Sequence, residues 1–292
     1  MDEPDREPGM SSLELLGLPA DARVLIVNND DFGMDEAIND AVIASIEEGI
    51  AASCSLMPPC PGAPHAMDLL RRREIPFGIH LTLVRDAGHC RWGPLSAREH
   101  VPSLLDEEGE LFTPPRIPDL LAGARLDEVE REFRAQIGAV LDAGLTPTHL
   151  DWHCLADGGR DDIFDLTVTL ADEYGLAVRA WLGPAREKLR RRGLPVVDHD
   201  FLDSFALDLD GKADRYAELL RALPSGMSEW ATHPSTGDEA SGAIDDGRRV
   251  RTTDYDFLTS PQARDIIREE GITVIGYEPL QRAWLQRAVH HR

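Results

Sequence analysis

Short apolar runs rich in β-branched and aromatic residues alternate with longer segments of helical period along most of the chain. This alternation is typical of a parallel sheet whose successive strands are connected by helices. We expect strands at residues 24–28, 52–57, 77–83, 147–151, 177–181, 229–233 and 272–277. We expect helices at residues 35–48, 63–73, 126–143, 161–174, 184–192, 212–222 and 260–270. The predicted fold class is therefore α/β, and within it a distorted (β/α) barrel of the TIM type.

The length of the chain fits a single barrel domain. The chain has 292 residues, and α/β barrels use about 250 residues as one unit. We expect residues 21–285 to form this domain and residues 1–20 to form a tail that is poorly ordered at its start. Two stretches rich in Gly, Pro and charge, 85–117 and 235–257, break the alternation. Such long loops are usually functional lids or disordered segments, and both interpretations stay open here.

The composition argues against several classes of partner. The formal net charge is −23, whereas nucleic-acid binding needs a basic face that releases counterions. No stretch approaches the roughly 20 apolar residues of a membrane helix, and the first residues are acidic where a secretion signal would be basic and then apolar. The four cysteines have neither zinc-finger spacing nor the density of a disulfide scaffold. We therefore expect a cytoplasmic protein without a nucleic-acid partner or a membrane span, and the oligomeric state stays open, with a homodimer as one option.

Unusual polar side chains lie at the carboxyl ends of the expected strands. They are Asp30, Asp31, His80, His149, Asp151, His153 and His233. In a (β/α) barrel this end carries the active site, while the opposite end mainly stabilises the fold. These residues come from four separate strands, so the sequence predicts that they meet at one mouth of the barrel.

Asp30 and Asp31 follow the first expected strand. Successive side chains of a regular strand point to opposite faces, so the two carboxylates cannot reach one ion while the strand continues. Phe32 and Gly33 suggest that the strand has ended. A sharp turn at Gly33 would let the carboxylates converge, one as a metal ligand and one as a proton acceptor. The alternative is a simple turn that caps the following helix.

Histidines on the third and fourth strands are candidate ligands. His80 interrupts an apolar strand, and it is either a metal ligand or a core residue that hydrogen-bonds a carbonyl group. His149, Asp151 and His153 lie on one face of an extended segment. This pattern suits a site in which one histidine binds a metal and a neighbouring carboxylate or imidazole orients it.

His233 and Arg179 end two further strands. His233, which precedes a proline, is either a turn residue or part of the site. For Arg179, contact with a hydroxyl or carboxylate of a substrate and a plain salt bridge are equally open. Cys154 should point away from His153 because side chains alternate along an extended chain, so we assign this cysteine to packing.

Four motifs make the chain resemble the YdjC-like carbohydrate deacetylases, which include bacterial chitooligosaccharide deacetylases and hopanoid-linked deacetylases. The motifs are Leu-Ile-Val-Asn-Asn-Asp-Asp-Phe-Gly at 25–33, Gly-Ile-His-Leu-Thr at 78–82, Thr-His-Leu-Asp-Trp-His at 148–153 and His-Pro at 233–234. Family members commonly continue the third motif with more histidines, whereas Cys154, Leu155, Ala156 and Asp157 follow here, and Trp152 replaces a small residue. This departure leaves the metal positions intact and affects the sugar subsites.

The resemblance implies a metal-dependent hydrolase that removes acetyl groups from small N-acetylated sugars or oligosaccharides. By motif position, Asp31, His80 and His153 would hold one divalent ion, and Asp30 would be the base. Imidazole ligands favour Zn²⁺, whereas a water-rich site with one carboxylate suits Mg²⁺ or Mn²⁺. An amide needs a stronger nucleophile than bulk water, and a metal-coordinated water with a pKa near roughly 7 supplies one.

In this mechanism Asp30 takes the proton of the water and His233 protonates the departing amine. The residues expected to contact the substrate or to orient the ligands are His149, Asp151, Trp152 and Arg179. Trp92, Trp152 and Trp181 could stack on sugar rings or belong to the core. Two other interpretations stay open: another metal-dependent barrel enzyme, such as a sugar isomerase or phosphoesterase, and a non-catalytic carbohydrate-binding protein.

Overall fold

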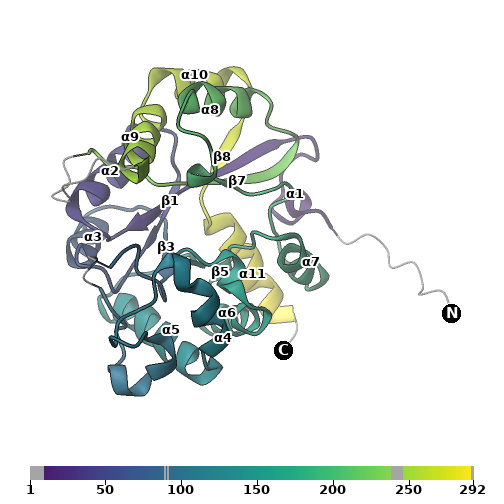
Figure 1. Cartoon of the computed structure of the whole chain (residues 1–292). Helices are drawn as coiled ribbons and strands as arrows, with labels where there is room; N and C mark the ends of the chain where they lie inside the picture. The colour runs from purple at the N-terminus through teal and green to yellow at the C-terminus, as the bar shows by residue number, and fades with distance from the viewer. Residues whose placement is uncertain (1–9, 89, 91, 238–245, 291–292) are drawn as a thin grey trace.

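The computed structural model describes residues 10–88, 90, 92–237 and 246–290, and within these ranges eight strands form one sheet (Figure 1). The strands are β1 (Arg23–Phe32), β2 (Ser53–Leu56), β3 (Phe77–Leu81), β4 (His149–Trp152), β5 (Ala177–Val178), β6 (Leu202–Asp203), β7 (Gly226–Thr232) and β8 (Thr273–Ile275). Each of their ladders is parallel. The predicted α/β class is confirmed.

The sheet is curled, and its pairing is open. The order of paired strands is β5-β4-β3-β2-β1-β7-β6, and within the described ranges no ladder joins β5 to β6. The eighth strand, β8, branches from this path because it pairs with the first half of β1, whereas β2 pairs with the second half. The expected distorted barrel is therefore a curled parallel sheet rather than the closed ring of a regular TIM barrel.

Strand β1 lies at the centre of the sheet and is buried on both faces. Alternate side chains belong to different apolar clusters, since Val24 and Ile26 pack in the larger one and Leu25 and Val27 in the smaller one. A continuous apolar run is what a parallel strand between two covered faces requires. The polar residues that continue this strand are thus carried from the core to the carboxyl edge of the sheet.

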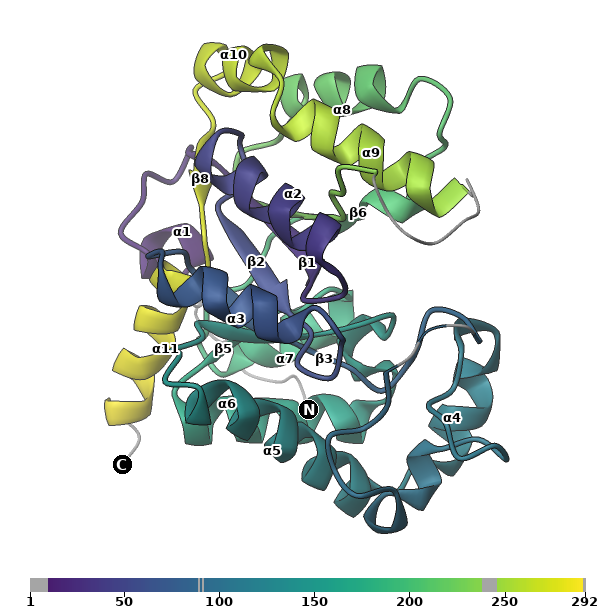
Figure 2. The same ribbon diagram turned by 90° about the vertical axis from the view of Figure 1, so that its left-hand side faces the viewer.

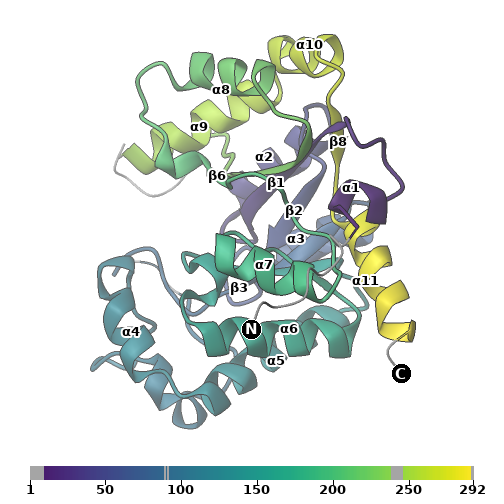
Figure 3. The same ribbon diagram turned by 90° about the vertical axis from the view of Figure 1, so that its right-hand side faces the viewer.

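Helices cover the outside of the sheet. The long ones are α2 (Glu36–Glu47), α3 (Ala63–Arg71), α5 (Leu126–Asp142), α6 (Asp161–Tyr174), α7 (Gly183–Arg191), α8 (Lys212–Arg221), α9 (Asp246–Leu258), α10 (Pro261–Glu269) and α11 (Glu278–His290). Figure 2 shows α8, α9 and α10 over one part of the sheet, α5 and α6 over another, and α2 and α3 between the two groups. Figure 3 shows α7 and α11 on the other side.

The segments expected to be loops contain regular structure. Residues 85–117 hold three short 3₁₀ helices and lead into α4 (Ile117–Gly123). The stretch 235–257 contains most of α9, while its residues 238–245 lie outside the described ranges. The part that forms α9 is therefore not an irregular loop, because this helix packs against α2 and α8, and the lid interpretation stays a prediction.

The segment before the sheet is anchored in the part that the structure describes. Residues 1–9, for which a poorly ordered start was expected, lie outside this part. The short helix α1 (Ser12–Leu15) follows, and the buried Ser12 hydroxyl donates a hydrogen bond of 2.6 Å to the carbonyl of Val196. Among the described helices, none combines the length and the apolar character needed to cross a membrane.

Candidate metal centre and active site

A cavity of about 340 Å³ opens at the carboxyl ends of the strands. Its walls come from the ends of β1, β3, β4, β6 and β7, from the segments that follow β3, β4, β5 and β6, and from α9. The lining residues are Asp30, Asp31, His80, Asp86, Pro114, Trp152, His153, Cys154, Ala156, Trp181, Asp203, Phe205, His233 and Arg251. The carboxyl edge of a parallel α/β sheet is where such folds place their ligand sites.

Asp30 and Asp31 converge because β1 is irregular at this point. The strand does not end before Phe32, as the sequence suggested, but its register with β2 shifts between Asn29 and Phe32. Asp31 has a φ of 65°, a left-handed conformation that non-glycine residues rarely adopt. The expected turn at Gly33, whose φ is 99°, follows two residues later. A bulge at Asp31 therefore breaks the alternation of side chains, and both carboxylates enter the cavity.

Three side chains form a cluster with the composition of a metal site. Nε2 of His80 lies 3.6 Å from Oδ1 of Asp31, and Nδ1 of His153 lies 3.1 Å from the same oxygen. One possible ligand atom from each residue lies within 4.8 Å of the others, and all three residues are buried. One carboxylate and two imidazoles from three strands thus surround one point, an arrangement that suits a divalent ion.

Two further carboxylates hold the imidazoles in place. Asp151 lies 2.9 Å from Nδ1 of His80, so the other nitrogen of this ring faces the cavity. Asp86 lies 2.6 Å from Nε2 of His153. Histidine ligands usually donate their second N–H to a carboxylate or carbonyl in this way, which fixes the ring and makes the ligating nitrogen more basic. Both contacts therefore fit a metal held by these two histidines.

The carboxylate of Asp30 is held by an arginine rather than by the two histidines. Arg179 donates two hydrogen bonds to it, of 2.8 and 2.9 Å, and Asn28 donates a third of 2.8 Å. Burial raises the pKa of the Asp30 carboxyl, but the charges of Arg179 and His80 outweigh burial, so the pKa lies below its ordinary value. Asp30 is therefore an anion that faces the cavity at neutral pH.

Arg179 is enclosed beneath the cavity. Besides Asp30, it contacts Asp151 at 3.0 Å and Glu229 at 2.8 Å. Glu229 also accepts a hydrogen bond of 2.6 Å from the Tyr277 hydroxyl. Of the two interpretations of Arg179, the buried salt bridge matches these contacts, whereas direct contact with a substrate does not, because this side chain does not line the cavity.

Arg251 of α9 binds the second oxygen of Asp31 at 2.6 Å. Burial raises the pKa of Asp31, but the charge of Arg251 and the hydrogen bond from His153 have the larger, opposite effect. The pKa therefore lies well below its usual range. Sequence reasoning missed both Arg251 and Asp86. Both come from the two stretches that broke the alternation, and nothing in their local sequence marks them as site residues.

His233 lies in the wall of the same cavity, directly after β7. Nδ1 of the ring is 2.8 Å from the hydroxyl of Ser204, and the ring meets Phe205 edge to face. The backbone N–H of His233 donates a hydrogen bond of 2.9 Å to Asp254 of α9. These contacts fix the ring and leave Nε2 as the nitrogen that can reach a substrate.

His149 and Trp152 occupy different environments. His149 is buried, stacks on Tyr277 at 3.7 Å between ring centroids, and does not line the cavity. It contacts the site through Asp151, which lies 3.7 Å from its Nε2. Trp152 lines the cavity while its indole N–H donates to Thr167. A stacking role is thus open for Trp152, whereas His149 supports the ligand-orienting Asp151.

Of the other two tryptophans considered for sugar stacking, Trp181 lies in the wall of the cavity and Trp92 lies in the core. Trp181 lines the cavity and packs against Phe201, with 4.2 Å between ring centroids. Trp92 packs in a small apolar cluster with Met57 and Leu111, and its indole N–H donates to a backbone carbonyl. The interpretation of Trp92 as a sugar-stacking residue is therefore replaced by the core interpretation.

The expected orientation of Cys154 is wrong. Its φ of 59° breaks the alternation that was assumed for the end of β4. As a result its sulfur lies 3.4 Å from Nε2 of His153 instead of pointing away, and the side chain is exposed at the cavity. The backbone conformation after a strand could not be read from the alternating pattern of the strand itself.

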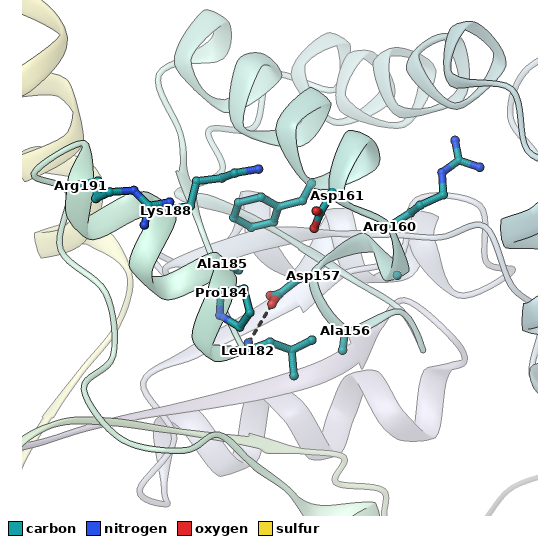
Figure 4. A pocket seen from close by; sticks show the side chains of 11 residues that line it. Ala156, Asp157, Arg160, Asp161, Leu182, Pro184, Ala185, Lys188 and Arg191 are labelled. Atoms are coloured by element: carbon teal, nitrogen blue, oxygen red, sulfur yellow. Dashed lines mark hydrogen bonds between the residues drawn. The ribbon is translucent and has the colours of Figure 1, made fainter. Parts of the chain in front are cut away.

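A second cavity, of about 410 Å³, adjoins the first one through the shared wall residue Ala156. It lies between α6 and α7, as Figure 4 shows. Asp157 accepts hydrogen bonds of 2.7 Å from the backbone N–H groups of Trp181 and Leu182. These bonds tie the segment after β4 to the segment after β5 and so hold the boundary between the two cavities.

Comparisons with known proteins agree on one family. A family model described as YdjC-like protein matches residues 24–269. A carbohydrate deacetylase of Thermoanaerobacter pseudethanolicus is 32% identical over 263 residues, which cover 89% of this chain and 100% of that relative. A chitooligosaccharide deacetylase of Serratia marcescens is 29% identical over 266 residues and covers 88% and 99%. The crystal structure of a putative cellobiose-phosphate cleavage protein from Enterococcus faecalis superposes with a TM-score of 0.72 at 25% identity, over 89% of this chain and 99% of that one.

Proposed function

The chain belongs to the YdjC-like family, and on this premise we propose that it is a metal-dependent carbohydrate deacetylase that hydrolyses the acetamido group of N-acetylated sugars. The observation that carries the proposal is the convergence of Asp31, His80 and His153 beside the anionic Asp30 in one cavity. The names of the relatives, carbohydrate deacetylase and chitooligosaccharide deacetylase, support the reaction class.

Asp31, His80 and His153 are the residues that would hold the ion. When bound, a divalent ion polarises the amide carbonyl and lowers the pKa of a coordinated water toward roughly 7, which supplies the nucleophile. Two imidazoles favour Zn²⁺ over Mg²⁺, because nitrogen donors suit zinc and magnesium prefers oxygen. The carboxylates of Asp151 and Asp86 orient the two imidazoles and thereby fix the geometry of the site.

Asp30 is the proposed general base. Its Oδ2 lies 3.9 Å from Nε2 of His80, so the base is adjacent to the proposed ligands without being one of them. The double hydrogen bond from Arg179 fixes the plane of the carboxylate and keeps it ionised. A fixed, ionised carboxylate at this point can take a proton from the attacking water.

His233 is the proposed general acid. An amine is a poor leaving group unless it is protonated as the C–N bond breaks, so the reaction needs a proton donor on the far side of the amide. The contact with Ser204 holds one ring nitrogen and directs the other toward the cavity. Phe205 restricts the ring from the side.

Variants at the site separate these roles. Acetate release from N,N′-diacetylchitobiose, called chitobiose below, should require a divalent ion and stop when a chelator is added. Asp31→Ala and His80→Ala should lose both the ion and the activity, since each removes a ligand. His233→Ala should keep the ion and lose about 10²- to 10⁴-fold in kcat, the usual contribution of general acid catalysis.

The measurements are elemental analysis of the purified variants and an acetate assay with N-acetylglucosamine and chitobiose. Loss of the ion from His233→Ala would assign this residue to the metal instead of the leaving group. Full acetate release by chelated wild-type protein would contradict metal dependence, and absence of release from any N-acetylated sugar would contradict the deacetylase proposal.

A further inference from the structure

We propose that Asp86, Nε2 of His153 and the sulfur of Cys154 form a second cation site, for a thiophilic divalent ion such as Zn²⁺, on the outer side of the imidazole that faces Asp31 and His80. This outer site is distinct from the proposed catalytic site, although both use His153. Its existence concerns metal binding alone and does not depend on the deacetylase reaction.

The three ligand atoms of the outer site are close enough to share one ion. Asp86 lies 2.6 Å and the Cys154 sulfur 3.4 Å from Nε2 of His153, and one atom from each residue lies within 4.8 Å of the others. Adjacent ligands of a tetrahedral zinc lie about 3.4–3.6 Å apart, given its bond lengths to nitrogen, oxygen and sulfur. The sulfur is already at this distance, and Asp86, whose side chain is 34% exposed, needs to withdraw by less than 1 Å.

The donor set selects the kind of ion. A thiolate, an imidazole and a carboxylate form a mixed set that suits zinc and cobalt, whereas magnesium binds oxygen almost exclusively. Cys154 is exposed at the cavity, so an ion reaches it from solvent. The left-handed backbone of Cys154, with φ of 59°, is what brings the sulfur next to His153.

A neighbouring acidic cluster shows why the outer site is the better candidate for a second ion. Asp30, His80 and Asp151 are also close enough to share an ion. There, however, Nη1 of Arg179 lies 2.8 Å from Asp30 and 3.0 Å from Asp151, so a guanidinium already supplies the positive charge. At the outer site Arg251 lies 3.9 Å from Asp86, and its shorter contact, of 2.6 Å, is with Asp31.

Occupation of the outer site would change the proposed catalytic site. The ion replaces the hydrogen bond between Asp86 and His153, and the proton of that bond passes to solvent. His153 then either shares its imidazole between two ions or turns away from Asp31, and both outcomes alter the ligand field of the first ion. Resting on the proposed function, we expect excess Zn²⁺ to inhibit deacetylation and excess Mg²⁺ to leave it unchanged.

Cobalt reports directly on the ligand that defines this site. The full-length protein, as purified with its bound ion, is titrated with Co²⁺ while the near-ultraviolet absorption is recorded, because a thiolate bound to Co²⁺ gives a charge-transfer band there. The wild type should develop this band up to one thiolate-bound cobalt per chain. Cys154→Ser should lose the band. Cys90→Ser should keep it, because Cys90, a half-buried cysteine four residues after Asp86, is not one of the three proposed ligands.

Asp86→Asn provides an independent variant that retains the sulfur. It should keep the band but need at least about tenfold more Co²⁺ for half-saturation, because even the loss of a residue that only orients a ligand weakens metal binding by about 10- to 100-fold. A wild type without the band, a band that persists in Cys154→Ser, or an unchanged midpoint in Asp86→Asn would each overturn the proposal. None of these outcomes depends on turnover, so a failed deacetylase assay leaves this test intact.

Discussion

Glu229 is the residue whose burial is least compensated among the carboxylates around Arg179. It receives one hydrogen bond from the guanidinium and one from Tyr277, while Asp30 and Asp151 share the same positive charge. Burial raises the pKa of Glu229 to about 7, although Arg179 and the Tyr277 hydroxyl act in the opposite direction. The charge state of this one side chain therefore changes near neutral pH.

The raised pKa makes folding stability depend on pH in a defined direction. An exposed glutamate in the unfolded chain loses its proton near pH 4.5, whereas in the folded chain the pKa of Glu229 is raised to about 7. Between these values the folded state binds one more proton, so stability falls as the pH rises. The loss amounts to about 3 kcal/mol once the pH exceeds the folded value.

Glu229→Gln should remove this pH dependence, because an amide does not ionise. Urea unfolding of both proteins at pH 5 and pH 8 measures the effect. The unfolding free energy of the variant minus that of the wild type should rise by about 2.5 kcal/mol between pH 5 and pH 8. If the unfolding free energies of the two proteins changed equally between pH 5 and pH 8, Glu229 would not titrate in this range.

Some residues of the site could be predicted from the sequence and others could not. Asp30, Asp31, His80 and His153 were found because they follow or interrupt apolar strands, where a polar residue has no structural reason to be. Asp86 and Arg251 were not found, since they belong to segments without a repeating pattern, and only the tertiary structure brings them to His153 and Asp31. Asp86 contacts His153, and Arg251 binds Asp31, each at 2.6 Å.

At the scale of elements, the central strands could be predicted from the sequence because they are packed on both faces. Apart from the half-buried Arg23, the residues of β1 and β3 are buried, and their sequences are apolar up to the polar residues that lead into the site. The two-residue strand β6 was missed, because it is defined by its pairing with β7 and not by an apolar run. Helix α9 was missed because its segment is rich in Arg, Thr and Asp, and few of its residues, among them Val250, Phe257 and Leu258, are buried.

The bulge at the end of β1 gives a prediction about the backbone. Gly33 has a φ of 99°, and a Cβ at this position would lie 3.0 Å from Leu56 Cδ1 and 3.2 Å from the carbonyl oxygen of Met57. Gly33→Ala should therefore lower the unfolding free energy by about 1–3 kcal/mol. It should also weaken metal binding, because the strain is relieved by moving the backbone next to Asp31.

Gly144→Ala is the matched control for this variant. Gly144 follows α5 with a φ of 77°, and a Cβ there would meet nothing within 4 Å. The Gly144→Ala variant should lose about 1–2 kcal/mol of stability, because alanine disfavours the left-handed backbone, and should keep its metal affinity. Calorimetry and metal titration of both variants test the prediction. Equal metal affinity in the two variants would contradict it, because the backbone at Gly33 would then not control the position of Asp31.

At the scale of the whole molecule, the curled sheet brings distant segments to one edge. The cavity collects side chains from residue 30 to residue 251, and α9 closes it by binding Asp31 through Arg251 and the backbone of His233 through Asp254. The buried Lys212 and Tyr216 of α8 contact Asp254 in turn. Helices α8 and α9 thus position both the proposed metal ligand Asp31 and the proposed general acid His233.

The same arrangement places the second cavity beside the first one, which bears on the length of the substrate. A cavity of about 340 Å³ is at the lower end of the range for small-molecule sites. The adjoining 410 Å³ between α6 and α7 offers room for a further sugar ring, and Leu182, which is 49% exposed, presents an apolar surface there. A disaccharide should therefore gain contacts that a monosaccharide does not make.

Leu182→Ala tests this extension without disturbing the core. It should lower kcat/KM for chitobiose by about three- to tenfold, since loss of a few methylene contacts costs roughly 1 kcal/mol, and should leave kcat/KM for N-acetylglucosamine nearly unchanged. Leu285→Ala, an equally exposed leucine on α11 that does not line either cavity, serves as the control and should affect neither sugar. Steady-state acetate release with both sugars measures the ratio. An equal loss for both sugars in Leu182→Ala would mean that the second ring lies elsewhere, because only a contact made by the longer substrate can change one value and spare the other.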